Sequence, residues 1–386
     1  MREIEVSSVL RHFAEFPDPR SPRGVRHKLV DILCISVLAV ICRANTYAEV
    51  WPYAQAKETW LRQFLELPHG IPSVDTFERV FAMMKPQVWE RWFVEWLQSL
   101  SLPPLAPGEA EVLAIDGKTS RRSYGKESGP LHTVSVWSSQ YELVIAQEAV
   151  QEKSNEISAI PQLLESINAA GAIVTTDAMG CQKEIAWLIR DQQADYLLAL
   201  KDNHPRLLAD TRWLFAHADG CGWKDIPHSY AQTHTQGHGR SETRECWVLT
   251  QLDILAERRA WRDLQALVRL RSTCTQQGQA SLEERFYITS LSPVLSAEDP
   301  GATAKRILQA ARLHWGIENG LHWRLDTAFR EDLNRARKNN AQANLVAVRH
   351  LALNVLKQDR SIKAGLETKR ARASWDDAYL LRLLGI

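Results

Sequence analysis

The chain has 386 residues, of which 45% are hydrophobic and 24% charged, a balance typical of a folded protein and a length that favours two or three structural units. The longest apolar run, Ile32 to Cys42, is too short to cross a bilayer. The charged start MREIEVSS lacks the apolar stretch of a secretion signal, and the six cysteines contain no Cys-x-x-Cys pair. We therefore expect a cytoplasmic protein without a disulfide framework.

The net charge of +1 conceals an uneven distribution of charge. Residues 301–386 contain 16 Lys and Arg against 8 Asp and Glu, a balance of +8, so residues 1–300 carry −7. Helices whose charged side chains face solvent would give the same excess of basic residues. The asymmetry nevertheless permits a phosphate-binding face in the C-terminal region.

Residues 1–105 show apolar positions at helical spacing, first in LVDILCISVLAVI and later in VWERWFVEWLQSL. They predict a helical N-terminal domain with a DNA-binding or associated role. The proline-rich segment LPPLAPGE, at 102–109, indicates its boundary.

Residues 106–202 change to a strand pattern. EVLAIDGK, LHTVSVWSS and LVIAQEAV are strand-like and joined by short polar turns, and helices then alternate with the strands AIVTTDAM and ADYLLALK. This order predicts an α/β fold with a mixed sheet flanked by helices. Strand-like pieces such as RFYITSL predict a β-rich insertion subdomain at 203–302. Helices return at 303–360, and 361–386 is expected to be a basic C-terminal tail.

Three carboxylates are candidate metal ligands. Asp116 and Asp177 each end a predicted buried strand, and Glu318 lies in a helix. Carboxylates that meet in one crevice repel one another unless a cation such as Mg²⁺ or Mn²⁺ neutralises them. An aspartate at a strand end is more often a turn or helix-cap residue, but the order of the three favours a metal site.

Several strings resemble one family of mobile-element proteins. They are FAEFPDPRSPRGVRHKLVDIL, IPSVDTF, LAIDGKTSRRS, VTTDAMGCQKEIA, LLALKDNHP, GHGRSETRE, YITSL and HWGIENGLHWRLDTAFREDLNRAR. Together they cover almost the whole chain and are similar to DDE transposases of the H-repeat-associated, ISAs-type insertion-sequence family. The resemblance implies a ribonuclease-H-like catalytic core that is interrupted by the insertion.

The resemblance also implies the activity. Asp116, Asp177 and Glu318 would be the catalytic and metal-binding triad, holding two Mg²⁺ or Mn²⁺ ions when DNA is bound. The reaction would cut double-stranded DNA at terminal inverted repeats and join the new 3′-hydroxyl to target DNA. The protein would act as a homodimer on DNA, near the bacterial nucleoid. Two alternatives stay open: an inactive transposase-derived DNA-binding protein, and a nuclease without strand transfer.

The wider related pattern places Tyr, Arg and Lys around the glutamate, where this chain has Ala311, His314 and Leu325. Substitutes for the missing phosphate contacts could be His314, His322 or Arg324. Trp315 could stack on an extruded base, or it could be a core anchor, as could Trp323.

Basic residues complete the predicted DNA-binding set. They are Lys118, Arg121 and Arg122 after the first aspartate, and Arg335, Arg337, Lys338 and Arg349 near the C-terminus. Lys and Arg neutralise phosphates without reading sequence. Each cluster alone is equally typical of a solvated face. Helical spacing places Glu318, His322 and Asp326 on one face, where Asp326 could join the site or pair with Arg330.

Overall fold

The computed structural model describes residues 9–23, 25–100, 102–124, 129–150, 156–237, 239–293 and 299–385. Residues 1–8, which contain the charged start, lie outside these ranges. The chain forms two compact units, which are described separately. Unit 1 comprises Met1–Pro104, Gly117–Ala159 and Glu318–Ile386, and unit 2 comprises Leu105–Asp116 and Ile160–Ile317.

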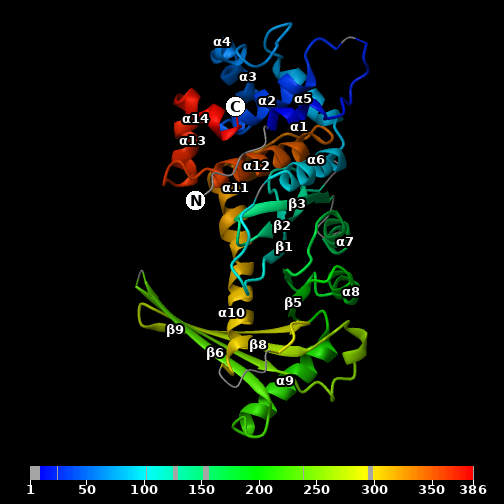
Figure 1. The fold of residues 1–386 in the computed structure, drawn as a ribbon, viewed down its shortest axis with the longest axis vertical. Coiled ribbons are helices and arrows are strands. Elements are labelled where there is room, and N and C mark those ends of the chain that lie inside the picture. Colours follow the sequence, from blue (N-terminus) through cyan, green and yellow to red (C-terminus); the bar gives the residue numbers. More distant parts are fainter. Residues whose placement is uncertain are drawn as a thin grey trace. The chain divides into compact units, whose positions relative to one another are not determined.

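Helices dominate unit 1 (Figure 1). They are α1 (Val9–Ala14), α2 (Leu29–Ile41), α3 (Tyr47–Ala56), α4 (Glu58–Leu61), α5 (Val74–Met83), α6 (Pro86–Gln98), α11 (Trp323–Thr327), α12 (Ala341–Gln358), α13 (Leu366–Trp375) and α14 (Asp377–Leu383). Nearly every residue of α2 is buried, which confirms the buried helix expected from the apolar run. Helix α12 packs against α2, α5 and α6, so the core of the helical N-terminal region includes a C-terminal helix.

The expected C-terminal tail is folded, and this corrects the sequence analysis. Residues 361–386 contain α13 and α14. Arg370 on α13 is 1% exposed, and one of its guanidinium nitrogens donates to the Val40 carbonyl oxygen at 2.8 Å. The basic count therefore overstates the charge that this segment presents to solvent.

Unit 1 also contains a strand meander. Strand β1 (Val112–Thr119) enters unit 1 at Gly117, and β2 (His132–Ser138) pairs antiparallel with β3 (Leu143–Val150). The sheet order β3-β2-β1 matches the three consecutive strands expected from the sequence. Helices α6 and α12 both pack on β3.

Two glutamates lie close together where α6 packs on β3. Glu90 on α6 accepts a hydrogen bond from the Ala149 amide at 3.3 Å. Burial, with repulsion from Glu148, raises the pKa of Glu90 to about 8, and burial raises the pKa of Glu148 to about 7. Both groups therefore favour the protonated form in the folded protein.

These raised pKa values predict that stability falls as the pH rises from about 5 to 8. The unfolded chain ionises these carboxyls near their ordinary values, so it loses protons first and gains relative to the folded state. Thermal unfolding of Glu90→Gln should depend less on pH over this window than that of the wild type. Glu95→Gln, an exposed change on the same helix, is the control. Parallel pH profiles for Glu90→Gln and the wild type would contradict the prediction.

Unit 2 is built on a mixed sheet. Its strands are β1, β4 (Ile173–Thr176), β5 (Asp195–Leu200), β6 (His228–Gly237), β7 (Arg240–Leu249), β8 (Ala266–Gln276) and β9 (Gln279–Thr289). The order is β1-β4-β5-β9-β8-β7-β6, with β1, β4 and β5 parallel and the remaining pairs antiparallel. The expected mixed α/β sheet is confirmed.

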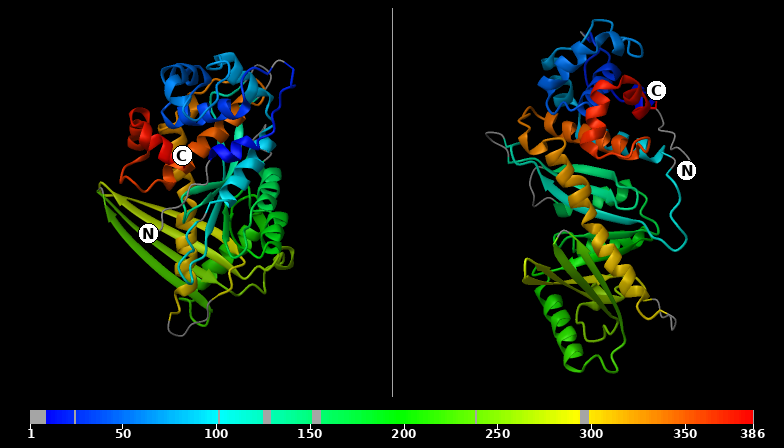
Figure 2. Two further views of the ribbon diagram at one scale, coloured as in Figure 1. Left: turned by 45° about the horizontal axis from the view of Figure 1, so that its top comes forward. Right: turned by 90° about the vertical axis from the view of Figure 1, so that its left-hand side faces the viewer.

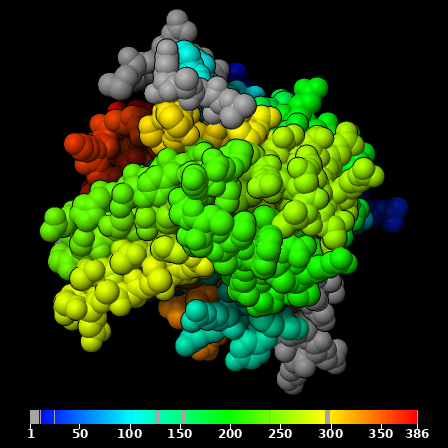
Figure 3. Space-filling view, turned by 90° about the horizontal axis from the view of Figure 1, so that it is seen from below, coloured from blue at the N-terminus to red at the C-terminus, as the bar shows by residue number. Residues whose placement is uncertain are grey.

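Helices cover both faces of this sheet. They include α7 (Glu156–Ser166), which starts in unit 1, α8 (Lys183–Asp191), α9 (Pro205–Gly220) and α10 (Ala302–His314), with a short 3-10 turn η2 (Arg258–Ala260). On β9, Tyr287 packs with the buried residues of α10, whereas the ring of Phe286 packs at a tilt against Phe215 of α9. Neighbouring strand residues point to opposite faces, so α9 and α10 lie on opposite sides. Figure 2 shows α10 crossing the strands, and Figure 3 shows the surface formed by α9 and the long strands.

The region 203–302 is β-rich as expected, but it is not a separate subdomain. Strand β9 pairs with β5 from Leu197↔Thr289 to Leu200↔Phe286. The four later strands therefore extend the central sheet, which corrects the expected domain boundaries. In the part of the chain that the structure describes, no helix is long and apolar enough to span a membrane.

Candidate active site

Asp116 lies in β1, and Asp177 directly follows β4, the parallel neighbour of β1 in the sheet. The last paired residues are Ile115 on β1 and Thr176 on β4, which face each other in the register. Each aspartate is the next residue in its strand direction. Both are partly exposed. Residues that directly follow paired positions on two parallel strands are neighbours across the sheet.

Asp177 also has a local structural role. Its Oδ1 atom accepts hydrogen bonds from the backbone amides of Met179 at 2.9 Å and Gly180 at 3.3 Å. This is the turn typical of an aspartate after a strand. Neither bond uses Oδ2, so the turn fixes the carboxylate without using both of its oxygens.

His314 and Trp315 lie at the end of α10 in unit 2. The Nδ1 atom of His314 is 2.9 Å from the Thr175 hydroxyl, and burial lowers the pKa of this histidine to about 4 although the charge of Asp177 opposes the shift. The Arg285 guanidinium lies over the Trp315 ring, 4.4 Å from its centroid. Trp315 is 40% exposed, so it is not a core anchor.

Glu318 begins a π-helical turn, η3 (Glu318–His322), in unit 1. Such turns occur frequently at functional sites because they displace side chains from ordinary helical positions. A Cβ on Gly320 would be 2.6 Å from the ring of Trp137 on β2, so glycine lets this turn pack tightly. The Glu318 side chain is exposed and has no hydrogen-bond or ion-pair partner among the described residues. His322 is partly buried in the same turn, and Trp323 is 53% exposed.

The oxygen donors suit a hard divalent cation. Two carboxylates at neighbouring strand ends match the ligands that Mg²⁺ and Mn²⁺ accept. Within the described ranges, no three His, Cys, Asp or Glu side chains form a group that could hold a metal ion. The fit therefore rests on the aspartate pair and on the donor chemistry.

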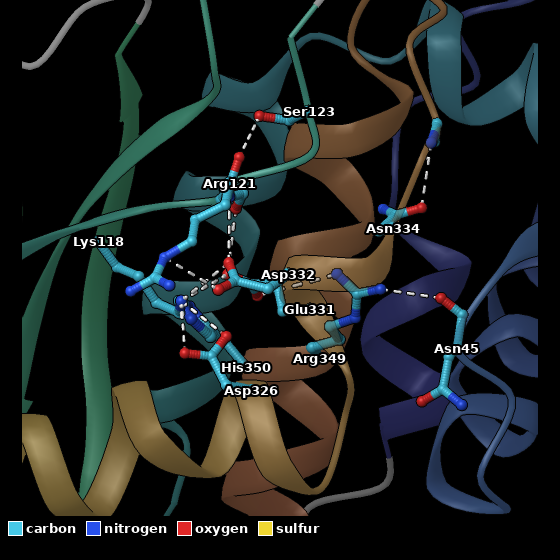
Figure 4. A network of polar contacts seen from close by, with 12 residues as sticks. Asn45, Lys118, Arg121, Ser123, Asp326, Glu331, Asp332, Asn334, Arg349 and His350 are labelled. Carbon is cyan, nitrogen blue, oxygen red and sulfur yellow. Dashed lines mark hydrogen bonds and ion pairs between the residues drawn. The ribbon is translucent and has the colours of Figure 1, made fainter.

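Lys118, expected to contact DNA, is surrounded by carboxylates within unit 1 (Figure 4). Its Nζ atom is 2.8 Å from Asp326, 3.6 Å from Asp332 and 4.0 Å from Glu331. The side chain is 10% exposed. Asp326 thus pairs with Lys118, which lies two residues after Asp116 in the sequence. The alternative prediction, that Asp326 pairs with Arg330, is wrong. We call Lys118, Asp326, Glu331 and Asp332 the lysine cage.

Arg349 was expected to contact phosphates, but the structure shows a buried residue. Its side chain is 0% exposed on α12, lies 3.8 Å from Glu331 and donates to the Asn45 carbonyl oxygen at 2.8 Å. Burial raises the pKa of Glu331 while the Arg349 charge opposes this shift. A phosphate cannot reach a fully buried guanidinium, so Arg349 leaves the proposed DNA-binding set.

The other predicted cations are accessible or partly so. Arg121 is 84% exposed in its side chain and lies 3.4 Å from Asp332 at the edge of the lysine cage. Exposed cations of unit 1 also include Arg122, Arg335, Arg337 and Lys338. The Arg337 guanidinium lies 5.4 Å from the ring centroid of Tyr124, which is 54% exposed. Arg324 is partly exposed over the Trp323 ring.

The sequence analysis missed Glu331 and Asp332. Glu331 lies in the 3-10 turn η4 (Glu331–Leu333) and accepts a hydrogen bond from Ser120 at 3.2 Å, while Asp332 accepts one from the Arg121 amide at 3.0 Å. The sequence offered one indication of these residues. In FREDL two acidic residues are adjacent, and no other adjacent acidic pair occurs between Glu318 and the apolar part of α12.

Comparisons with known proteins identify the class. A family described as "DDE_Tnp_1-associated" matches residues 10–97, and the family "Transposase DDE domain" matches residues 107–355. The chain belongs to the DDE transposase family, as its sequence resemblance implied.

Full-length relatives come from Escherichia coli. The chain is 35% identical over 388 residues to the "H repeat-associated putative transposase YhhI" of strain K12, covering 99% of this chain and 98% of that protein. It is 34% identical over 387 residues to the "Putative transposase YncI" of O157:H7, covering 99% and 95%. A solved piggyBac transposase synaptic complex with hairpin DNA is 10% identical to this chain and has a TM-score of 0.42, with 100% of this chain and 79% of that chain covered.

Proposed function

We propose that this protein is an active DNA transposase that hydrolyses phosphodiester bonds at element ends and transfers the new 3′-hydroxyl to target DNA. The observation that supports the proposal is the pairing of Ile115 with Thr176, the residues directly before Asp116 and Asp177. The proposed third carboxylate is Glu318, which begins the π-helical turn.

The three carboxylates would hold two Mg²⁺ or Mn²⁺ ions. Bound there, such ions lower the pKa of an attacking water and offset the charge on the leaving oxygen. The turn around Asp177, in which Oδ1 accepts from the Met179 amide, would hold one of these carboxylates in place. Exposed cations of unit 1 would neutralise DNA phosphates, and the partly exposed Trp315 offers a ring on which a base can stack.

The test is an assay with labelled DNA from both sides of the coding sequence. Duplexes are incubated with Mg²⁺, with Mn²⁺ or with EDTA, and with or without a supplied 3′-hydroxyl end. Metal-dependent cleavage followed by joining supports the transposase. Cleavage without joining would show a nuclease, and binding without cleavage would show an inactive DNA-binding protein.

A triple neutralisation tests the proposed phosphate contacts. Replacing Arg335, Arg337 and Lys338 with Gln should weaken binding to every duplex alike and reduce the magnitude of the log–log salt slope by roughly 2 to 3 units, about 0.9 for each lost contact. Binding is measured by fluorescence anisotropy at several salt concentrations.

A matched triple variant serves as the control. Lys224, Arg258 and Arg259 are also exposed cations, but they lie in unit 2. Their replacement by Gln should leave the salt slope close to that of the wild type. An unchanged slope in the first triple variant, with affinity lost for one sequence only, would show that those residues read bases instead.

A further inference from the structure

The three residues that follow Asp116 lie beside a buried histidine–glutamate pair in unit 1. His132 on β2 is 1% exposed, and Glu156, the first residue of α7, is 5% exposed. The His132 Nε2 atom faces the Glu156 carboxylate, and its Nδ1 atom lies 2.8 Å from the Thr119 hydroxyl. One polar chain therefore connects α7, β2 and the end of β1.

Gly117 lies directly against this pair. A Cβ at this position would overlap the His132 Nε2 atom and the carboxylate of Glu156. The backbone of Gly117 does not have a positive φ, so glycine is required here for space and not for conformation. The residue next to Asp116 is thus packed on its buried neighbours without room for a methyl group.

The chemistry of the pair makes this packing specific. A buried carboxylate is costly unless a hydrogen-bond donor compensates it. An ionised Glu156 can only accept, so it favours a hydrogen on His132 Nε2. In a neutral imidazole the Nδ1 atom is then an acceptor, and it suits the Thr119 hydroxyl as donor. The pair thereby fixes the ring orientation and holds the end of β1 through a side chain as well as through its backbone.

We propose that His132 and Glu156 are positioning residues that hold the end of β1, and with it Asp116, in the arrangement needed for DNA cleavage. The proposal rests on the cleavage function proposed above. A general structural role would make loss of either residue destabilise the whole protein. The positioning role instead confines the change to the segment around Asp116. Neither residue contacts DNA, since both are buried.

The test uses the full chain with His132→Gln, Glu156→Gln and Gly117→Ala. Each variant should cut DNA roughly 10² times more slowly in a single turnover, as expected when a reacting group is misplaced by about 1 Å. Affinity for the same DNA in EDTA should not change. Hydrogen exchange, followed by mass spectrometry, should accelerate in peptides covering 113–123 and stay unchanged in peptides from α2.

A double-mutant cycle adds a second measurement. Gly117→Ala combined with His132→Ala should cut DNA faster than the two single losses together predict, because the smaller residue at 132 removes one of the two overlaps with the added methyl group. The control is Asn354→Ala. Asn354 is also buried, and it hydrogen-bonds the Val144 backbone on β3 at 2.9 and 3.0 Å. This variant should lower the unfolding temperature without slowing cleavage by the folded protein.

The outcomes separate the two proposals. Wild-type exchange rates in 113–123, or wild-type cleavage despite faster exchange, would overturn the positioning role and leave the transposase function standing. Cleavage that is slowed only in proportion to the unfolded fraction would also overturn it. A wild type that does not cut DNA under any metal condition would overturn the proposed function, and the positioning role with it.

Discussion

Replacing Asp116, Asp177 or Glu318 with the corresponding amide should reduce DNA cleavage by roughly 10³-fold or more, comparable with the loss of a group that stabilises charge in the transition state. The amide keeps the size of the side chain but removes the charge that offsets a divalent cation. Binding of DNA should be retained or slightly strengthened, because a negative charge next to the phosphates has been removed.

The measurement combines single-turnover cleavage with a binding assay in EDTA. Asp195→Asn is a suitable control. Asp195 is the first residue of β5, so it lies at the edge of the unit 2 sheet opposite to that of Asp177, and it pairs with Arg190. It should cut at nearly the wild-type rate. Undiminished cleavage by purified Glu318→Gln protein would remove Glu318 from the triad and redirect attention to the lysine cage.

Replacing Arg349 with Met should destabilise the protein by about 3–5 kcal/mol, the usual effect of leaving one buried charge without its partner. Glu331 would lose its ion pair while remaining 2% exposed. Lys118 lies farther away, at 4.0 Å, and is shared with Asp326 and Asp332. Urea denaturation gives the change in the free energy of unfolding.

Two further variants make this prediction specific. The double variant Glu331→Met/Arg349→Met should recover much of the lost stability, since it leaves no unpaired charge between these two positions. Arg121→Met should change stability by less than about 0.5 kcal/mol, because Arg121 is a solvent-exposed partner of Asp332. A stable Arg349→Met protein with weakened DNA binding would return Arg349 to the DNA-binding set.

Much of the fold and the aspartate pair could be predicted because each depends on local patterns. The run around α2 predicts a buried helix through its length and composition, and the helix is almost fully buried. Asp116 follows the four buried residues of β1, Asp177 follows the buried strand β4, and the two strands are parallel neighbours. Whether Glu318 joins them stays a prediction, which the amide variants above address.

Two predictions were wrong because charge was taken to indicate exposure to solvent and distance in the sequence was taken to indicate distance in the fold. Arg349 was counted with the exposed cations although it interrupts the apolar run LVAVRHLALNVL, a context typical of a buried, paired charge. We expected the region 203–302 to be a separate subdomain because its polar turns and strand-like pieces interrupt the alternation of helices and strands. Pairing of β9 with β5 is a tertiary interaction that local patterns do not encode, although the apolar RFYIT segment resembles a central strand.

The lysine cage could not be predicted for a different reason. Lys118 and its carboxylate partners are separated by about two hundred residues in the sequence, as the bond to Asp326 shows. Spacing by four suggested that Glu318, His322 and Asp326 share a helix face, but the π-helical turn changes the spacing after Glu318. Only the folded chain shows that Asp326 faces Lys118.

Pairing of β5 with β9 has a consequence for synthesis of the protein. Strand β5 precedes the 203–302 region and β9 lies near its end, so β5 leaves the ribosome long before β9 does. Until β9 is made, the edge of the apolar strand β5 that pairs with β9 has no partner strand. At roughly 5–20 residues per second, that interval is on the order of ten seconds. Nascent chains that stall within α9 or β6 would display this edge to one another, and aggregation should therefore depend on where translation pauses as well as on how stable the finished protein is.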